Sequence, residues 1–252
     1  MGVSKLGNAS DALPSPTRPM FRNRLLQRLP AEELRRVRPH LARIRLAQGD
    51  VLQCAGDRVG QAFFVEEGYV SLMAEASGAE GRVEVGLIGR ESVVGSSVLL
   101  APDPASSLQA MAQVPGTAYA MRADALHASL EHAPVLRRAM RQAAETLVAQ
   151  LAQVAACNSR HALPERLARW LLMAHDRVDG DELPLTQDLL ATMLAVRRPG
   201  VTIAMGALEA AGLLRHSRGR IVICDRPGLE AAACGCYARL CQFVATLTES
   251  VS

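Results

Sequence analysis

The hydrophobic pattern divides the chain into a β-rich part followed by a helical part. Apolar residues at helical spacing over 20–38 predict a helix, after which apolar and polar positions alternate in short runs. These runs cover residues 43–46, 51–54, 62–65, 69–73, 83–88, 108–114 and 117–121. We interpret Glu66–Gly68 and Pro115–Gly116 as turns between strands. Short strands at this spacing predict a small β-sandwich or barrel over residues 41–122.

A long helix follows the β-rich part. After a short helical segment over 123–132, Pro134 suits the first turn of a second helix. Apolar or small residues then recur at intervals of four and three, which is typical of a coiled-coil seam about two heptads long. The seam comprises Met140, Ala144, Leu147, Leu151 and Val154. Its place between two domains favours a dimerisation helix over 134–157, and the alternative is that the helix packs on its own β-domain.

The segment LTQDLLATMLAVRRPGVTIAMGALEAAGLL, residues 185–214, combines a helical pattern with two helix breakers. Thr186 suits the N-cap of a helix that ends near Leu194. Pro199 suits the first turn of a following helix, because the N–H that proline lacks has no intrahelical partner there. The pattern therefore predicts two helices, of which the second starts at the arginines.

These two helices fit a helix-turn-helix. Apolar or small residues fill the slots at which its helices cross closely, with Ala195 at the turn where glycine is usual. Counted from Gln187, the slots hold Leu190, Ala191, Leu194, Val196, Val201 and Ala204. Near its N-terminus, the end that enters the major groove, the second helix would present Arg197, Arg198, Thr202 and Met205 outward.

A hairpin of strands over 213–216 and 220–224 would add a wing, which carries Arg218 and Arg220 towards phosphates. Charge supports this interpretation only locally, since the net charge of +3 decides nothing by itself. From residue 195 to 226 there are six arginines but only two acidic residues. Clustered arginine attracts the phosphates of double-stranded DNA. The alternative is a helical module that binds protein rather than DNA.

Composition narrows the function further. The 252 residues, 49% of them hydrophobic, suffice for one or two domains with real cores. Glycine-rich phosphate loops, a GxSxG elbow and metal-triad motifs are absent, which argues against an enzyme. Residues 1–20 are predicted to be a disordered leader, without the apolar core of a signal peptide. Because no apolar run approaches ~18 residues, we expect a cytoplasmic protein with no membrane partner.

The six cysteines are expected to be free thiols, because the chain is long and shows no secretory leader. Three of them, Cys234, Cys236 and Cys241, fall within a predicted C-terminal tail over 233–252. Thiols this close are candidates for a metal- or redox-responsive element. Their spacing matches no standard zinc pattern, so ordinary free thiols are the preferred interpretation.

From residue 20 to 237 the chain resembles the Crp/Fnr family of bacterial transcription regulators, most specifically over LTQDLLATMLAVRRPGVTIAMGALEAAGLLRHSRGRIVICD. The resemblance implies an α+β fold in three parts. These are an N-terminal β-jelly-roll sensor domain of the cyclic-nucleotide-binding type (21–133), a coiled-coil dimerisation helix (134–157) and a C-terminal winged helix-turn-helix (158–232). It also implies a homodimer on a roughly palindromic operator, with RNA polymerase as a further partner.

The resemblance also assigns roles within the second helix. Arg198 matches the family's base-reading arginine, which suits a bidentate contact with guanine. Pro199 stands where many members carry a base-contacting glutamate, and Ile203 replaces a second common arginine. The operator therefore differs from the familiar one. The remaining candidates, Arg197, Thr202, Arg218 and Arg220, would contact the DNA backbone.

The sensor domain departs from members that bind cyclic AMP. In the segment GRESVVGSSVLLAPDPASSLQA, Gly95 is in place but Ser96 stands where those members have glutamate. No arginine or lysine occurs over 91–121, so a buried phosphate would lose its main attraction. This argues against the usual binding of cyclic AMP and leaves Gly95, Ser96, Ser106 and Ser107 as pocket candidates for an unidentified effector. An iron–sulfur centre of the oxygen-sensing type is also disfavoured, because the first cysteine is Cys54.

Overall fold

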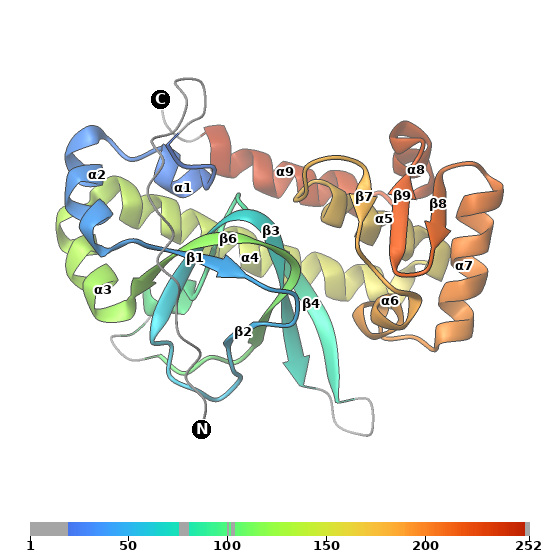
Figure 1. The fold of residues 1–252 in the computed structure, drawn as a ribbon, viewed down its shortest axis with the longest axis horizontal. Helices are drawn as coiled ribbons and strands as arrows, with labels where there is room; N and C mark the ends of the chain where they lie inside the picture. The colour runs from blue at the N-terminus through green and yellow to red at the C-terminus, as the bar shows by residue number, and fades with distance from the viewer. Residues whose placement is uncertain (1–19, 76–80, 100, 102–103, 250–252) are drawn as a thin grey trace.

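The computed structural model describes residues 20–75, 81–99, 101 and 104–249. Figure 1 shows a β-rich domain at one end, a helical domain with a small sheet at the other, and the long helix α4 (Pro134–Arg160) running between them. The α+β class and this order of parts confirm the fold predicted from the sequence. The expected leader lies outside the described residues, apart from Met20. Within the described residues, no helix is both long and apolar enough to cross a membrane.

The β-rich domain is built on one antiparallel sheet that curls on itself. Four strands are neighbours in the order β1 (Ala42–Leu46), β6 (Gln109–Arg122), β3 (Gln61–Glu75) and β4 (Arg82–Ile88). β2 (Val51–Gln53) pairs with β6, and β5 (Val93–Val94) pairs with β3 just before the short helix η2 (Ser96–Leu99). Three short helices precede the strands: α1 (Arg24–Gln27), α2 (Ala31–Val37) and η1 (Arg38–His40). The helix α3 (Ala123–His132) follows the last strand. Side chains of α1, α2 and α3 share one apolar cluster with the start of α4.

The two turns predicted inside the β-rich domain are not turns. β3 continues through Glu66–Gly68, and β6 continues through Pro115–Gly116. The two glycines lie where these long strands bend against each other: a Cβ at Gly68 would collide with the carbonyl oxygen of Val114, and one at Gly116 would collide with that of Glu67. The register shifts at the same place, as in a β-bulge. Glycine therefore marks a close backbone approach here, not the end of a strand.

The apolar stripe of α4 packs on this chain's own domains. Met140 is fully buried among the N-terminal helices, and Val154 lines a narrow cavity with Trp170. Leu147 and Leu151 lie over the position where a Cβ of Gly86 would stand, so they cover β4. The prediction that Met140 and Val154 meet a partner helix is therefore wrong, since both side chains are buried within the chain.

The predicted C-terminal tail is instead a helix, α9 (Cys236–Glu249), preceded by α8 (Arg226–Ala232). Figure 1 shows α9 lying along α4, and the hydroxyl of Thr146 on α4 donates a hydrogen bond to the carbonyl oxygen of Phe243 at 3.4 Å. Tyr237 and Leu240 bury their side chains in the core of the C-terminal domain. The described part of the predicted tail therefore belongs to the folded core rather than to an appendage.

The C-terminal domain follows the predicted order of elements. It contains α5 (Leu163–His175), β7 (Glu182–Leu183), α6 (Gln187–Leu194), α7 (Arg198–Ala210), β8 (Leu214–Ser217) and β9 (Arg220–Ile223). The strands form a sheet in the order β7-β9-β8, so Glu182 and Leu183 pair with the predicted wing. Its core runs into the β-rich domain, since Trp170 and Met173 share one cluster with Tyr69 and Leu87.

Buried polar contacts cross the junction between the two domains. Arg177, just after α5, pairs with Glu91 at 2.7 Å, with side chains 5% and 9% exposed. Trp170 donates its indole N–H to Glu84 on β4, whose other oxygen accepts a hydrogen bond from the Ser71 hydroxyl at 2.6 Å. Burial raises the pKa of Glu84 to about 7. The two domains are therefore joined by buried hydrogen bonds and by the ion pair of Arg177 and Glu91. Separating that pair within a low-dielectric environment would cost free energy.

Candidate nucleic-acid interface

Local capping explains why α6 and α7 form where they do. The Thr186 hydroxyl accepts a hydrogen bond from the Leu189 N–H at 3.2 Å and so caps α6. The helix ends at Ala195, which has a φ of 52°, the left-handed conformation that glycine adopts most easily. A second helix then begins at Arg198 with Pro199 in its first turn. The predicted break, the turn at Ala195 and the start at the arginines are therefore all present.

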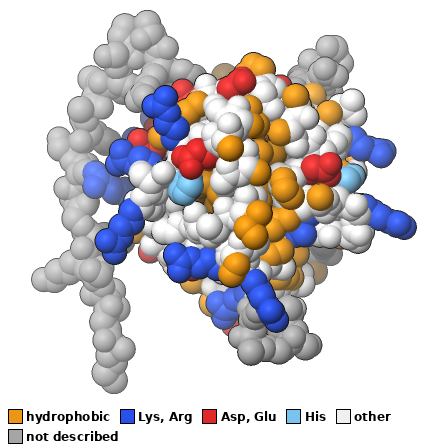
Figure 2. Space-filling view, turned by 90° about the vertical axis from the view of Figure 1, so that its right-hand side faces the viewer, with side chains coloured by type: hydrophobic (Ala, Val, Ile, Leu, Met, Phe, Trp, Pro, Cys, Tyr) orange, Lys and Arg blue, Asp and Glu red, His pale blue; other side chains and the backbone are white. Residues whose placement is uncertain are grey.

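The exposed face of α7 carries most of the predicted contacts. Arg197, Arg198, Pro199 and Thr202 are exposed at or near its N-terminus. Figure 2 looks onto this end of the molecule, where arginine side chains surround a band of apolar ones. Ile203, also on α7, is an apolar side chain that is 75% exposed. An exposed helix of this composition can approach a base edge closely while the arginines meet phosphates.

Met205 is the exception among the predicted contacts. Its side chain is fully buried in the core of the C-terminal domain. On α7 it lies four residues after Val201 and one after Ala204, both of which are buried. It therefore belongs to the inward stripe of the helix, and the prediction that it faces outward is wrong.

The polar side chains of α6 and α7 hold one another in place. Arg198 pairs with Asp188 of α6 at 3.2 Å, and both side chains are well exposed. The Thr202 hydroxyl donates a hydrogen bond to the Gln187 side chain at 2.7 Å. An exposed ion pair contributes little free energy, so a phosphate or base can replace Asp188 as the partner of Arg198 at small cost.

The wing places its arginines beside this helix in the same domain. Arg218 is exposed in the turn between β8 and β9. Arg220, at the start of β9, pairs with Glu182 of β7 at 2.9 Å. Because β7 pairs with the central strand β9, Glu182 holds the Arg220 side chain against the wing sheet, whereas Arg218 is exposed in the turn at the tip of the wing.

Two family models match the chain, one for each domain. The cyclic nucleotide-binding domain matches residues 43–133, and the Crp-like helix-turn-helix domain matches residues 165–232. Together they account for more than half of the chain. The chain belongs to the Crp/Fnr family. Crp/Fnr proteins are transcription regulators rather than enzymes, and they bind DNA and act as dimers.

Solved Crp/Fnr structures have the same fold. FixK2 from Bradyrhizobium japonicum is 16% identical, with 77% of this chain and 98% of that chain covered and a TM-score of 0.65. The c-di-GMP-responsive global regulator CLP from Xanthomonas campestris is 19% identical, with 77% and 99% covered and a TM-score of 0.61. A CRP-family transcriptional regulator from Thermus thermophilus is 19% identical, with 75% and 96% covered and a TM-score of 0.62. A search of curated protein sequences found no match.

The four effector-pocket candidates of this Crp/Fnr regulator do not share one environment. The Ser106 hydroxyl donates a hydrogen bond to the Leu108 carbonyl at 2.6 Å and also meets the Gln53 side chain, so it stabilises its own loop. Ser107 is exposed, while Gly95 and Ser96 are half-buried at the start of η2. Gly95 has a φ of +85°, and a Cβ there would lie 2.7 Å from the Gln61 carbonyl oxygen. Glycine is therefore required at this position by the backbone conformation and the close approach of Gln61.

Three cysteines and one histidine of the regulator form a cluster that the sequence pattern indicated only in part. Cys234 and Cys236 meet Cys157 and His161 from the end of α4, whereas Cys241 is exposed and stands outside the group. Burial raises the pKa of the Cys157 thiol and raises that of Cys234 to about 12. The missed signal is the spacing Cys157-x3-His161, which puts two ligands on one helix face. This spacing indicates a metal site only when the fold brings Cys234 and Cys236 next to Cys157 and His161.

Proposed function

We propose that the protein is a homodimeric regulator. Its helix α7 would contact the bases of a roughly palindromic operator, and its wing would contact the flanking phosphates. The observation that supports this most directly is the exposed, arginine-bearing N-terminus of α7, next to a wing with an exposed arginine at its tip. In a dimer on B-DNA, the two recognition helices would lie about 34–36 Å apart, one helical turn. Ile203 would contact a thymine methyl group in place of a polar base contact.

Arg198 and Arg218 should respond differently to substitution. Arg198→Ala should weaken operator binding by roughly 1–3 kcal/mol and relax the preference at one base pair, because a bidentate base contact is lost. Arg218→Ala should weaken binding to all sequences and lower the salt slope by about one, because a phosphate contact is lost. Fluorescence anisotropy on a selected operator and its single-base variants, over a range of salt, separates the two effects. Equal operator affinity for wild type and Arg198→Ala contradicts the assignment.

The same titration on random DNA tests the alternative of a protein-binding module. Affinity that falls steeply with salt supports phosphate contacts. Flat or undetectable binding to any DNA favours the protein-binding module instead.

For the dimer we propose a face of α4 that overlaps the predicted seam at Ala144 and Leu151 but is centred on the exposed side of the helix, at Val148 and Ala155. Ala144, Val148, Leu151 and Ala155 recur at intervals of four, three and four residues along α4. Val148 is 67% exposed, whereas Met140 and Val154 are buried. A stripe of small and branched residues of this kind permits close packing of two parallel helices. The exposure of Val148 and Ala155, with Ala144 and Leu151 half-buried beside them, supports the use of this stripe as the contact between protomers.

Val148→Glu should raise the dissociation constant of the dimer at least ~10-fold, about 1.4 kcal/mol, because two carboxylates would face each other across the seam. Sedimentation velocity over a dilution series measures this. Val51→Glu is the matched control, since Val51 is another exposed valine but lies on β2. Unchanged dimerisation in Val148→Glu would place the interface elsewhere.

We further propose that the sensor domain does not bind cyclic AMP in the usual way. Ser96 and the absence of any basic residue over 91–121 support this, since nothing in that stretch neutralises a phosphate. Saturating cyclic AMP should therefore leave the melting temperature essentially unchanged in a thermal-shift assay. A large upward shift overturns the proposal.

A further inference from the structure

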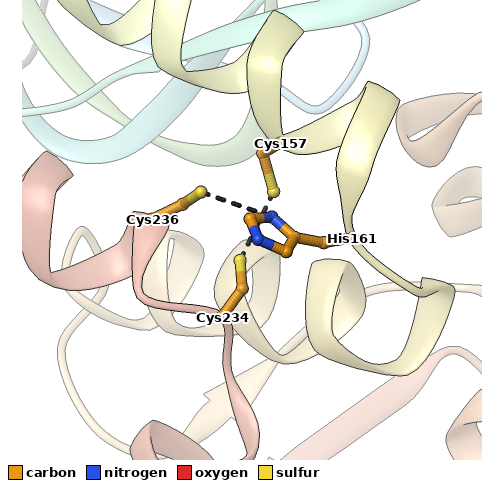
Figure 3. A group of neighbouring side chains, drawn as sticks. All are labelled: Cys157, His161, Cys234 and Cys236. Atoms are coloured by element: carbon orange, nitrogen blue, oxygen red, sulfur yellow. Dashed lines mark hydrogen bonds between the residues drawn. The ribbon is translucent and has the colours of Figure 1, made fainter.

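Four metal-ligand side chains converge where α4 ends and the DNA-binding domain begins. Cys157 lies in the last turn of α4 and His161 is the residue that caps it, while Cys234 lies two residues before α9 and Cys236 is its first residue (Figure 3). The sulfur atoms of Cys157 and Cys234 are 3.4 Å apart, and the Cys236 sulfur is 3.5 Å from Nδ1 of His161. All four ligand atoms lie within 4.8 Å of one another.

These distances suit one tetrahedral metal ion. Zn²⁺ binds sulfur at about 2.3 Å and imidazole nitrogen at about 2.0–2.1 Å, which in a tetrahedral site of three sulfurs and one nitrogen places neighbouring ligand atoms about 3.5–3.8 Å apart. The four atoms therefore need to shift only slightly to enclose a single ion. A polynuclear iron–sulfur cluster spreads its thiolates over several iron atoms, which needs wider spacing. Three sulfurs and one imidazole are also a ligand set that structural zinc sites use.

The backbone fixes the ligands in pairs. Cys157 and His161 are four residues apart, so they share a face of the helix, and the His161 N–H donates to the Cys157 carbonyl at 3.0 Å. Cys234 and Cys236 stand on either side of Gly235, where the chain turns into α9. The Gln153 amide lies 3.0 Å from the Cys236 sulfur and donates a hydrogen bond to it, an outer contact of the kind that stabilises a metal-bound thiolate.

The surrounding charge also matches a bound zinc ion. Arg169 is 2% exposed, its Nε has no hydrogen-bond partner, and it forms no ion pair with a carboxylate within the described residues. Its charge interacts with the Glu84 carboxyl group on one side and with the Cys157 sulfur on the other. A zinc ion with three thiolates and a neutral imidazole carries a net charge of −1. That charge would compensate the buried guanidinium.

We propose that Cys157, His161, Cys234 and Cys236 form a mononuclear Zn²⁺ site that ties α9 to the end of α4. Three of the ligands are buried and the fourth, His161, is half-buried, so the ion would be closed off from substrates. The site lies at the connection between α4 and α5, the one covalent link from the β-rich domain to the helix-turn-helix. Its zinc therefore holds the orientation of the DNA-binding domain and does not take part in catalysis. The proposal stands independently of how the protein reads DNA.

The test is metal analysis of the purified full-length chain, kept reduced and free of chelators. We expect one zinc per chain, and replacement by Co²⁺ should give the visible bands of a tetrahedral thiolate site. The double variant Cys234→Ser/Cys236→Ser should lose the metal. Cys241→Ser is the matched control, because Cys241 also lies on α9 but outside the group, and it should retain one zinc.

Measurements on the wild-type chain keep the proposal testable if the double variant fails to fold. Metal-free wild type should take up one Zn²⁺ in competition with a chromophoric chelator, with a rise in melting temperature. Failure of the reduced wild type to bind Zn²⁺ overturns the proposal. So does equal metal loss in Cys241→Ser, zinc retained by the double variant, or iron with inorganic sulfide in protein prepared without oxygen.

Discussion

Arg177→Met should lower the free energy of unfolding by about 3–5 kcal/mol, because it leaves the Glu91 carboxylate buried without its cation. In the wild type, Arg177 also donates to the Met173 carbonyl at 2.6 Å, so it ties α5 to the β-rich domain. Methionine fills a similar volume but supplies no charge. Glu91 would keep its hydrogen bond from the Gly89 N–H at 3.0 Å, which cannot replace a guanidinium. Urea unfolding at neutral pH and fixed protein concentration measures the loss.

Two further variants show whether the loss is caused by the buried charge. Arg177→Met combined with Glu91→Gln should be more stable than Arg177→Met alone, since no unpaired carboxylate is then buried. Asp179→Asn is the control: it removes exposed pairs with Arg22 and Arg90 at the same junction and should cost less than about 1 kcal/mol. A double variant no more stable than the single one would exclude the buried charge as the cause.

The helix-turn-helix could be predicted from the sequence because its determinants are local. The Thr186 cap, the position of Pro199 and the apolar spacing between them depend on neighbours within a few residues. Even the unusual Ala195 falls at the turn that the pattern specifies. The prediction for Met205 was wrong because neighbouring positions on α7 can face opposite ways, and Met205 lies on the buried face of the helix.

The β-rich domain was harder because glycine has two roles in strands. Gly68 and Gly116 occur in sequences typical of turns, yet each lies inside a strand at a point where two backbones nearly touch. Only the pairing of β3 with β6, residues about 50 positions apart, distinguishes a bulge from a turn. Sequence pattern therefore located the strands but divided two long ones in half.

The interpretation of α4 was limited by a similar ambiguity. A stripe of apolar residues at intervals of four and three indicates a packed face but does not name the neighbour. Here Gly86 lets α4 lie close to β4, and this chain's own domains cover the stripe. The cysteine cluster shows the same limit, because Cys157 is 77 positions from Cys234 and no local rule connects them.

The carboxyl group of Glu84 should make stability depend on pH near neutrality. Its pKa is about 7 in the folded chain, raised by burial from an ordinary value of 4.5, and the hydrogen bonds from Ser71 and Trp170 only partly offset burial. Between these values the folded state binds more protons than the unfolded state, so stability falls as pH rises from about 4.5 to about 7. The full cost, about 3 kcal/mol, is present above pH 7.

Glu84→Gln should remove this dependence, because the amide stays neutral at every pH while its oxygen can still accept the Trp170 N–H. Relative to wild type, the variant should therefore gain up to about 3 kcal/mol of unfolding free energy between pH 5 and pH 8. Urea unfolding at several pH values in that window measures the gain. Glu32→Gln, at an exposed carboxylate paired with Arg36, is the control and should follow the wild-type curve. If the difference between Glu84→Gln and wild type is the same at pH 5 and pH 8, Glu84 does not titrate in this range. The carboxyl group would then stay in one protonation state from pH 5 to pH 8, and the contact between Trp170 and β4 would not depend on pH.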